Sequence, residues 1–168
     1  MGDHSVDAID TLTRIANALG APEQVTKVAQ RVEHALEIGP INALELGKVI
    51  ANRLPENAIV VDEGATNGLG AFLMTGNAAP HDRLTLTGGA IGAGLPMAVG
   101  AAIACPDQKV VGLEADGSAM YTVQALWTMV REDLDVTVLI LNNGSYAIPV
   151  SYTHLRAHET GRNLVFRL

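Results

Sequence analysis

Apolar residues recur at helical spacing through the first third of the chain. A first pattern covers residues 6–19, with Ser5 as a possible N-cap and Gly20 placed to end the helix. A second pattern covers residues 22–39, and a third covers residues 44–54. We therefore expect three amphipathic helices, the first two of which look like the tail and linker of a domain upstream.

From residue 58 the pattern changes to short apolar runs that alternate with helical segments. It predicts strands at residues 58–63, 83–87, 109–115 and 136–143, separated by helices at 67–74, 94–104 and 120–132. This alternation is typical of an α/β protein with a doubly wound, mostly parallel sheet and flanking helices. Ligands in that architecture lie at the carboxyl ends of the strands. In the last helix, a stripe of Val123, Leu126, Trp127 and Val130 is expected to be core.

Composition limits the classes of partner. The 168 residues are 48% hydrophobic, enough for one globular core. The net charge of -7 and the lack of any run of Lys or Arg argue against a nucleic-acid partner. A single cysteine, Cys105, excludes an internal disulfide framework and fits a reducing compartment. The first ten residues lack the features of a secretory signal, so we expect a cytoplasmic location.

One uncharged stretch, residues 84–106, is long enough to raise the question of a membrane span. Its threonines, its glycines and Pro96 instead favour a strand, a glycine loop and a buried helix. We therefore expect no membrane partner.

The candidate chemistry lies at two strand ends. Asp116, Gly117 and Ser118 follow one predicted strand, and Asn143 ends the next. A right-handed crossover brings both ends to the same edge of the sheet. A carboxylate and an amide oxygen suit Mg²⁺ or Ca²⁺, and the N–H groups of Gly117 and Ser118 suit a phosphate. Alternatively, Asp116 and Ser118 are helix N-caps and Asn143 begins an ordinary turn.

These two strand ends also carry a family resemblance. Residues 115–148 resemble the thiamine-diphosphate signature, which opens with Gly-Asp-Gly and closes with Asn-Asn; Ala115 stands where the motif usually has Gly. The subgroup it looks most like is the acetolactate synthase and benzoylformate decarboxylase family of 2-oxo acid enzymes. The resemblance implies a Mg²⁺ ion held by Asp116, the side chain of Asn143 and the backbone carbonyl of Ser145. It implies further that Gly117, Ser118, Asn143, Ser145 and Tyr146 bind the cofactor.

The glycine loop within residues 84–102 strengthens the resemblance, because the family has a similar Gly-x-x-Gly-x-Gly-Leu-Pro loop one crossover earlier. By that resemblance, Ile91 wedges the cofactor into a bent conformation and the carbonyl of Gly89 accepts from its 4'-amino group. Ala65 and Thr66 would touch the diphosphate, although Thr66 is equally plausible as a helix cap. The loop contains no G-x-G-x-x-G, so we reject a nicotinamide-binding motif.

The last residues have a different character. Residues 149–160 resemble the in-frame translation of a transposase sequencing adapter, and 161–168 look like more of the same. His154 and His158 have the spacing of a zinc site on a helix, but the adapter origin is the favoured interpretation. The expected organisation is thus a domain tail and linker at 1–39, a partial, truncated thiamine-diphosphate-binding domain at 40–148, and a non-native segment at 149–168.

The resemblance implies that the parent protein decarboxylates a 2-oxo acid and joins the product to a second oxo acid, as acetolactate synthase does. A lyase similar to benzoylformate decarboxylase is the alternative. In the family, a separate domain supplies the glutamate that activates the cofactor; Glu63 is on the wrong motif to replace it. We expect an inactive fragment of a homodimeric or homotetrameric enzyme.

Overall fold

The computed structural model describes residues 7–24 and 28–143 and divides the chain into two units, Met1–Gln30 and Arg31–Leu168. The first unit contains one helix, α1 (Ala8–Ala18), within its described part. Asp7, not Ser5, caps it by accepting hydrogen bonds from the backbone N–H groups of Ile9 and Asp10. The predicted amphipathic helix is confirmed, but none of its residues is buried.

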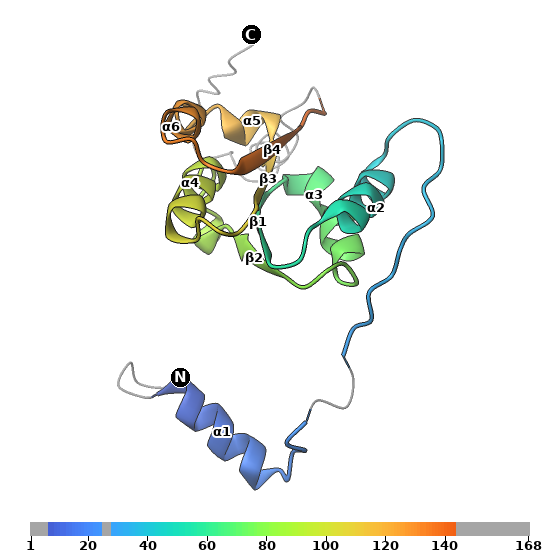
Figure 1. Cartoon of the computed structure of the whole chain (residues 1–168), viewed down its shortest axis with the longest axis vertical. Coiled ribbons are helices and arrows are strands. Elements are labelled where there is room, and N and C mark those ends of the chain that lie inside the picture. Colours follow the sequence, from blue (N-terminus) through green and yellow to red (C-terminus); the bar gives the residue numbers. More distant parts are fainter. Residues whose placement is uncertain (1–6, 25–27, 144–168) are drawn as a thin grey trace, which may run out of the picture. The chain divides into compact units, whose positions relative to one another are not determined.

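The second unit is an α/β fold (Figure 1). Its elements are α2 (Ala43–Arg53), β1 (Ala58–Glu63), α3 (Ala65–Thr75), β2 (His81–Thr85), the 3-10 turn η1 (Thr87–Gly89), α4 (Gly94–Ala104), β3 (Val110–Ala115), α5 (Asp116–Ala119), α6 (Ala125–Arg131) and β4 (Val136–Leu141). The four strands form one parallel sheet in the order β2-β1-β3-β4. The predicted α/β class and parallel sheet are confirmed.

Successive strand residues point to opposite sides of the sheet, so both faces carry apolar side chains. Two helices cover each face. On what we call the α2/α3 face, Ala58 and Val60 of β1 pack with Ile50, Leu54, Ala71, Val111 and Leu113. On the α4/α6 face, Ile59 and Val61 pack with Leu95, Ala98, Ala102, Val110 and Met129. The same alternation sends Asp62 toward α3 and Glu63 toward α4, where each approaches a glycine of that helix.

Helices α2 and α3 touch through their backbones. A Cβ atom added to Gly70 would overlap the carbonyl oxygen of Ala43, and one added to Gly47 would overlap the carbonyl oxygen of Gly70. Only glycine fits at such a close approach. These two glycines therefore fix the spacing of the helix pair that covers one face of the sheet.

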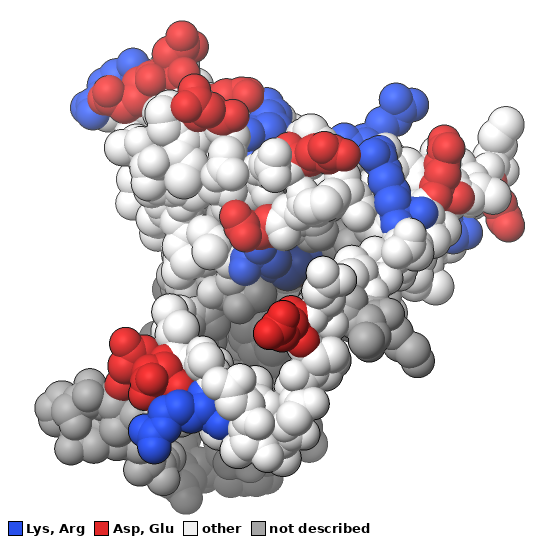
Figure 2. All heavy atoms as spheres, turned by 60° about the horizontal axis from the view of Figure 1, so that its bottom comes forward, with Lys and Arg blue, Asp and Glu red and all other residues white. Residues whose placement is uncertain are grey.

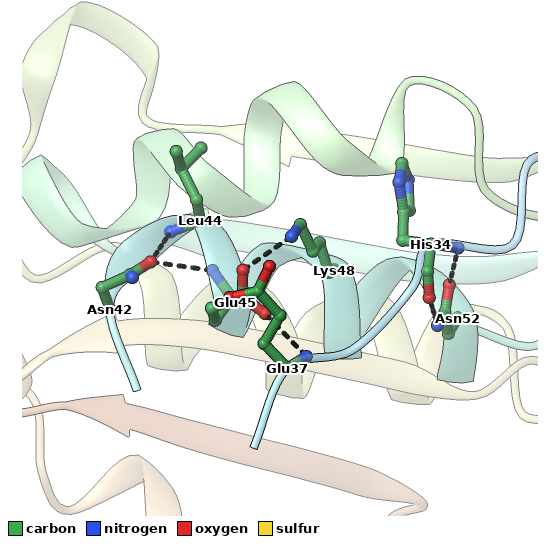
Figure 3. Close-up of polar contacts among 7 residues, drawn as sticks. All are labelled: His34, Glu37, Asn42, Leu44, Glu45, Lys48 and Asn52. Carbon is green, nitrogen blue, oxygen red and sulfur yellow. Dashed lines mark hydrogen bonds and ion pairs between the residues drawn. The ribbon is translucent and has the colours of Figure 1, made fainter. Parts of the chain in front are cut away.

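The segment before α2 corrects the sequence analysis. The helix predicted over residues 22–39 is wrong for residues 28–39, which form no helix. The N–H of His34 donates to Oδ1 of Asn52, and Nδ2 of Asn52 returns a hydrogen bond to the carbonyl of His34, at 2.9 and 2.8 Å (Figure 3). The N–H of Val32 donates to the carbonyl of Asn77. Backbone groups that a helix would pair internally are thus bonded to other parts of the unit.

The start of α2 has its own polar contacts, drawn in Figure 3. Oδ1 of Asn42 caps the helix by accepting from the N–H groups of Leu44 and Glu45. Lys48 donates to Glu45 at 2.6 Å and lowers the pKa of that carboxyl. The N–H of Glu37 also donates to Glu45, at 3.5 Å. Glu45 therefore connects the segment before α2 to the helix.

Two further predictions need correction. The strand expected at 83–87 lies at His81–Thr85, and the helix expected at 120–132 begins only at Ala125. The shorter α6 turns Ala125 and Met129 toward the core, whereas Trp127 is 62% and Val130 81% exposed. The expected core stripe is therefore wrong for the exposed members of that set, which include Val123.

The described surface bears on two expected partners. Among the described residues, no helix is both long and apolar enough to span a bilayer. On the face in Figure 2, Lys and Arg side chains lie among Asp and Glu side chains. That nucleic acid is not a partner stays a prediction.

Candidate functional site

A cavity of about 480 Å³ opens at the carboxyl edge of the sheet. From β1 the chain runs through α3 to the edge strand β2, and then returns through α4 to β3 on the other side of β1. Such a reversal leaves a crevice at the strand ends. The lining includes these predicted site residues: Ala65, Thr66, Gly89, Ile91, Asp116, Gly117, Ser118 and Asn143. Ser145 and Tyr146 lie outside the described residues.

The end of β3 supplies the candidate diphosphate contacts. Asp116, Gly117 and Ser118 form the first turn of the short helix α5, not the approach to a longer helix as expected. The hydroxyl of Ser118 donates to Oε1 of Glu114 at 2.6 Å, so it is turned into the protein. The N–H groups of a first helical turn have no partner within the helix. Gly117 and Ser118 would therefore meet a phosphate with their backbone.

The donor set at this edge has the chemistry that Mg²⁺ prefers. Asp116 and Asn143 follow the neighbouring strands β3 and β4, and both line the cavity. They offer carboxylate and amide oxygens, and Mg²⁺ takes few protein ligands beside phosphate oxygens and water. Among the described residues, no three His, Cys, Asp or Glu side chains gather into a metal cluster. His154 and His158 lie outside the described residues.

The alternative roles as helix caps do not hold. The N-cap positions of α3, α5 and α6 are Gly64, Ala115 and Gln124, and none of them makes a side-chain capping bond. Thr66, Asp116 and Ser118 therefore cap no helix. All three residues line the cavity, where they are available to contact a ligand.

The turn between β1 and α3 forms one wall. Oδ1 of Asp62 accepts from the N–H of Gly64 at 3.0 Å, and Oδ2 meets Nη1 of Arg83 at 2.5 Å. Nη2 of Arg83 reaches the hydroxyl of Thr75. Ala65, which follows Gly64 in the turn, has φ of 49°. Backbone strain of that kind in a non-glycine residue costs about 1–3 kcal/mol and concentrates at functional sites.

The glycine loop after β2 contributes Gly89 and Ile91 to the lining of the cavity. Gly88, Gly89 and Gly92 have φ of 63°, 69° and 86°, which favours glycine at each position. The hydroxyl of Thr122 donates to the carbonyl of Gly92 at 2.7 Å. Ile91 is 45% exposed and lines the cavity, as a residue that contacts a ligand would.

The burial and pairing of two carboxyl groups were not predicted by the sequence analysis. Glu63 and Glu114 are register partners on β1 and β3 and are 3% and 2% exposed. Burial raises the pKa of Glu114 to about 7; the charge and hydrogen bond of Glu63 add to this rise, and the hydrogen bond from Ser118 opposes it. A glutamate within or at the end of an apolar strand run, as in AIVVDE and VVGLEA, was the available signal.

The cavity, its oxygen donors and its glycine loop agree with a comparison of sequences. Residues 62–162, more than half of the chain, match the family described as thiamine pyrophosphate enzyme, C-terminal TPP binding domain. The chain belongs to this family. Because the match includes residues 149–162, it overlaps the segment interpreted as a translated adapter; that interpretation stays a prediction.

Particular relatives narrow the subgroup. The chain is 50% identical over 141 residues to IlvX of Mycobacterium tuberculosis, which is named as an acetolactate synthase large subunit, covering 84% of this chain and 27% of that protein. It is 33% identical over 132 residues to benzoylformate decarboxylase of Pseudomonas aeruginosa, covering 74% and 25%. This domain is thus related to both enzymes, and the chain spans about a quarter of their length.

A solved structure agrees. The thiamine diphosphate-dependent 4-hydroxybenzoylformate decarboxylase of Rhodococcus jostii matches with a TM-score of 0.68 and 29% identity. The match covers 90% of this chain and 29% of that one. The fold is therefore that of thiamine-diphosphate-dependent enzymes.

Proposed function

We propose that the cavity at the carboxyl edge of the sheet binds thiamine diphosphate together with Mg²⁺. The observation that carries the proposal is that the described candidate residues, drawn from the ends of β1, β3 and β4 and from the glycine loop, all line one cavity. Asp116 and Asn143, with the carbonyl of Ser145, hold the metal. The backbone N–H groups of Gly117 and Ser118 hold the diphosphate, aided by Ala65, Thr66 and Tyr146.

The glycine loop contacts the rings of the cofactor. Ile91 sets their bent conformation, and the carbonyl of Gly89 accepts a hydrogen bond from the 4'-amino group. When bound, thiamine diphosphate supplies the nucleophilic carbon that attacks the carbonyl group of a 2-oxo acid. In this proposal the chain's own residues bind and orient the cofactor, and none of them acts as acid or base.

The parent protein, we propose, decarboxylates a 2-oxo acid and transfers the product to a second oxo acid, as its likeness to an acetolactate synthase large subunit suggests. A benzoylformate decarboxylase-like lyase is the second candidate, supported by the relatives of that name. The parent is a cytoplasmic homodimer or homotetramer in this proposal; exposed apolar side chains such as Trp127 and Val130 are consistent with burial in an assembly.

A candidate of another class is a chain that binds the cofactor without catalysing a reaction. We expect the isolated polypeptide not to turn over pyruvate, because Glu63 is occupied by backbone N–H groups and no other residue here is proposed to activate the cofactor. An assay for CO₂ and acetolactate with added cofactor and Mg²⁺ measures this. Sustained, cofactor-dependent release of either product would contradict it.

The binding proposal is tested by calorimetric titration with thiamine diphosphate, with and without Mg²⁺. We expect Mg²⁺-dependent binding that weakens at least about tenfold in Asp116→Ala, since a charged metal ligand is removed. Asp107→Ala is the matched control, because Asp107 is exposed and precedes β3 at the other edge of the sheet. Absence of binding to a chain that circular dichroism shows to be folded would overturn the proposal.

A further inference from the structure

One carboxylate holds the backbone of the glycine loop at two points. Oε1 of Glu63 accepts from the N–H of Gly92, and Oε2 accepts from the N–H of Gly94, each at 2.5 Å. Hydrogen bonds from N–H groups to an ionised oxygen are about twice as strong as neutral ones. Both bonds are buried, so water does not compete for them.

The loop is shaped to receive this carboxylate. A Cβ atom on Gly94 would overlap Oε2 of Glu114 and would lie 2.6 Å from Oε2 of Glu63. Gly92 has φ of 86°, and a Cβ atom there would lie 2.6 Å from Cβ of Tyr121. The absence of side chains at both positions is what allows the loop backbone to reach the carboxylate.

The carboxylate is itself held in place. Glu63 ends β1, and its register partner Glu114 on β3 is hydrogen-bonded to it. Glu114 in turn accepts a hydrogen bond from the hydroxyl of Ser118. The bond from Ser118 uses its hydroxyl and leaves out the backbone N–H groups of Gly117 and Ser118 that are proposed to meet the diphosphate.

We propose that Glu63 is a positioning residue, whose carboxylate fixes residues 92–94 and thereby sets Gly89 and Ile91 at the wall of the cavity. Ile91 directly precedes Gly92, so its backbone moves with the bonded segment. This inference rests on the proposed binding of thiamine diphosphate. It predicts that Glu63 governs recognition of the rings of the cofactor, while the diphosphate contacts at the end of β3 do not depend on it.

The first test needs no ligand. Amide hydrogen exchange of Gly92 and Gly94 is measured by NMR in the full chain, in Glu63→Gln and in Glu132→Gln. Glutamine replaces one of the two accepting oxygens by an NH₂ group, which cannot accept a hydrogen bond, so we expect exchange at this pair to accelerate at least about tenfold. Glu132→Gln makes the same chemical change at an exposed position outside the cavity, and we expect exchange within about twofold of the original chain.

The second test separates loop position from general stability. Calorimetry compares thiamine diphosphate with inorganic diphosphate, both with Mg²⁺. In Glu63→Gln we expect thiamine diphosphate to bind at least about tenfold more weakly and inorganic diphosphate to bind within about twofold of the original affinity. A variant that merely loses stability would weaken both ligands alike.

The outcomes are distinct. Unchanged exchange at Gly92 and Gly94 in Glu63→Gln overturns the inference, as does an equal loss of affinity for both ligands. If the original chain binds neither ligand, the proposed function fails, and faster exchange confined to the two glycines still supports the positional role. Should Glu63→Gln not fold, Glu63→Asp, one methylene shorter, is expected to give the same pattern; a folded Glu63→Asp with unchanged exchange overturns the inference.

Discussion

On the α2/α3 face of the sheet, Asp62, the first of the two acidic residues of β1, meets Arg83 at 2.5 Å. On the α4/α6 face, the next residue, Glu63, meets two backbone N–H groups and a second carboxyl group, Glu114. Neighbours in sequence thus enter two unlike environments, because side chains alternate across a strand. One face is braced by an ion pair and touching helices, and on the other face a buried carboxylate holds the glycine loop.

The brace on the α2/α3 face is broken most severely by Gly70→Ala. The added methyl group meets the backbone carbonyl of Ala43, which cannot move aside without separating α2 from α3. We expect the free energy of unfolding in urea to fall by about 4 kcal/mol or more.

Gly100→Ala is the control on the other face. Nothing lies within 4 Å of a Cβ atom at Gly100 in α4, so alanine is expected to leave stability unchanged or raise it by up to about 1 kcal/mol. Similar unfolding curves for the two variants would show that α2 and α3 do not touch as described.

The acids on the α4/α6 face make stability depend on pH. Burial is the largest cause that raises the pKa of Glu114 from 4.5 to about 7. Between pH 4.5 and pH 7 the folded chain therefore holds a proton that the unfolded chain has released. This contribution is fully present below pH 4.5 and is lost as the pH rises to about 7. One pKa unit corresponds to about 1.4 kcal/mol, which gives a decline of roughly 3 kcal/mol.

Urea unfolding at a series of pH values measures this decline. Glu114→Gln removes the titrating group while keeping a neutral hydrogen-bonding side chain, so this part of the decline should be absent from the variant. The exposed Glu132, paired with Arg131, provides the control Glu132→Gln, which should keep the slope. An equal slope in all three chains would contradict the buried acid pair.

A smaller effect is expected from Arg83→Met. Asp62 would lose its cation while remaining 14% exposed, and we expect the free energy of unfolding to fall by about 2 kcal/mol. Arg131→Met removes an exposed arginine paired with Glu132 and should cost less than about 1 kcal/mol. Urea titration at pH 7 compares them; equal losses would mean that the Asp62 pair is no stronger than a surface pair.

The elements that sequence reasoning found are those whose burial pattern is local. The strands at residues 58–63 and 136–141 are short apolar runs, and the helix at 94–104 follows a glycine loop, so each could be predicted from its own residues. The candidate residues of the cavity lie in three stretches, namely Ala65 with Thr66, the glycine loop, and the two strand ends at Asp116 and Asn143. They were identified from the strand ends and from the family resemblance. Their roles toward cofactor and metal stay predictions.

What escaped sequence reasoning depends on partners far along the chain. The apolar spacing of residues 28–39 favours a helix, but Asn52 and Asn77 take its backbone hydrogen bonds. The pairing of Glu63 with Glu114 depends on the register of β1 with β3, which no local pattern contains. In α6, tight turns delay the helix start to Ala125, which changes the buried face.

The strand order also bears on how the chain is made. Strand β1 can pair with β2 soon after both leave the ribosome, but its other neighbour, β3, begins only at Val110. Contacts between distant residues form slowly. A nascent chain halted before Val110 would thus carry Glu63 without Glu114. Its glycine loop would also lack the hydrogen bond from Thr122 to Gly92. Competence to bind a ligand would arise late in synthesis, when the segment from Asp116 to Asn143 completes the cavity.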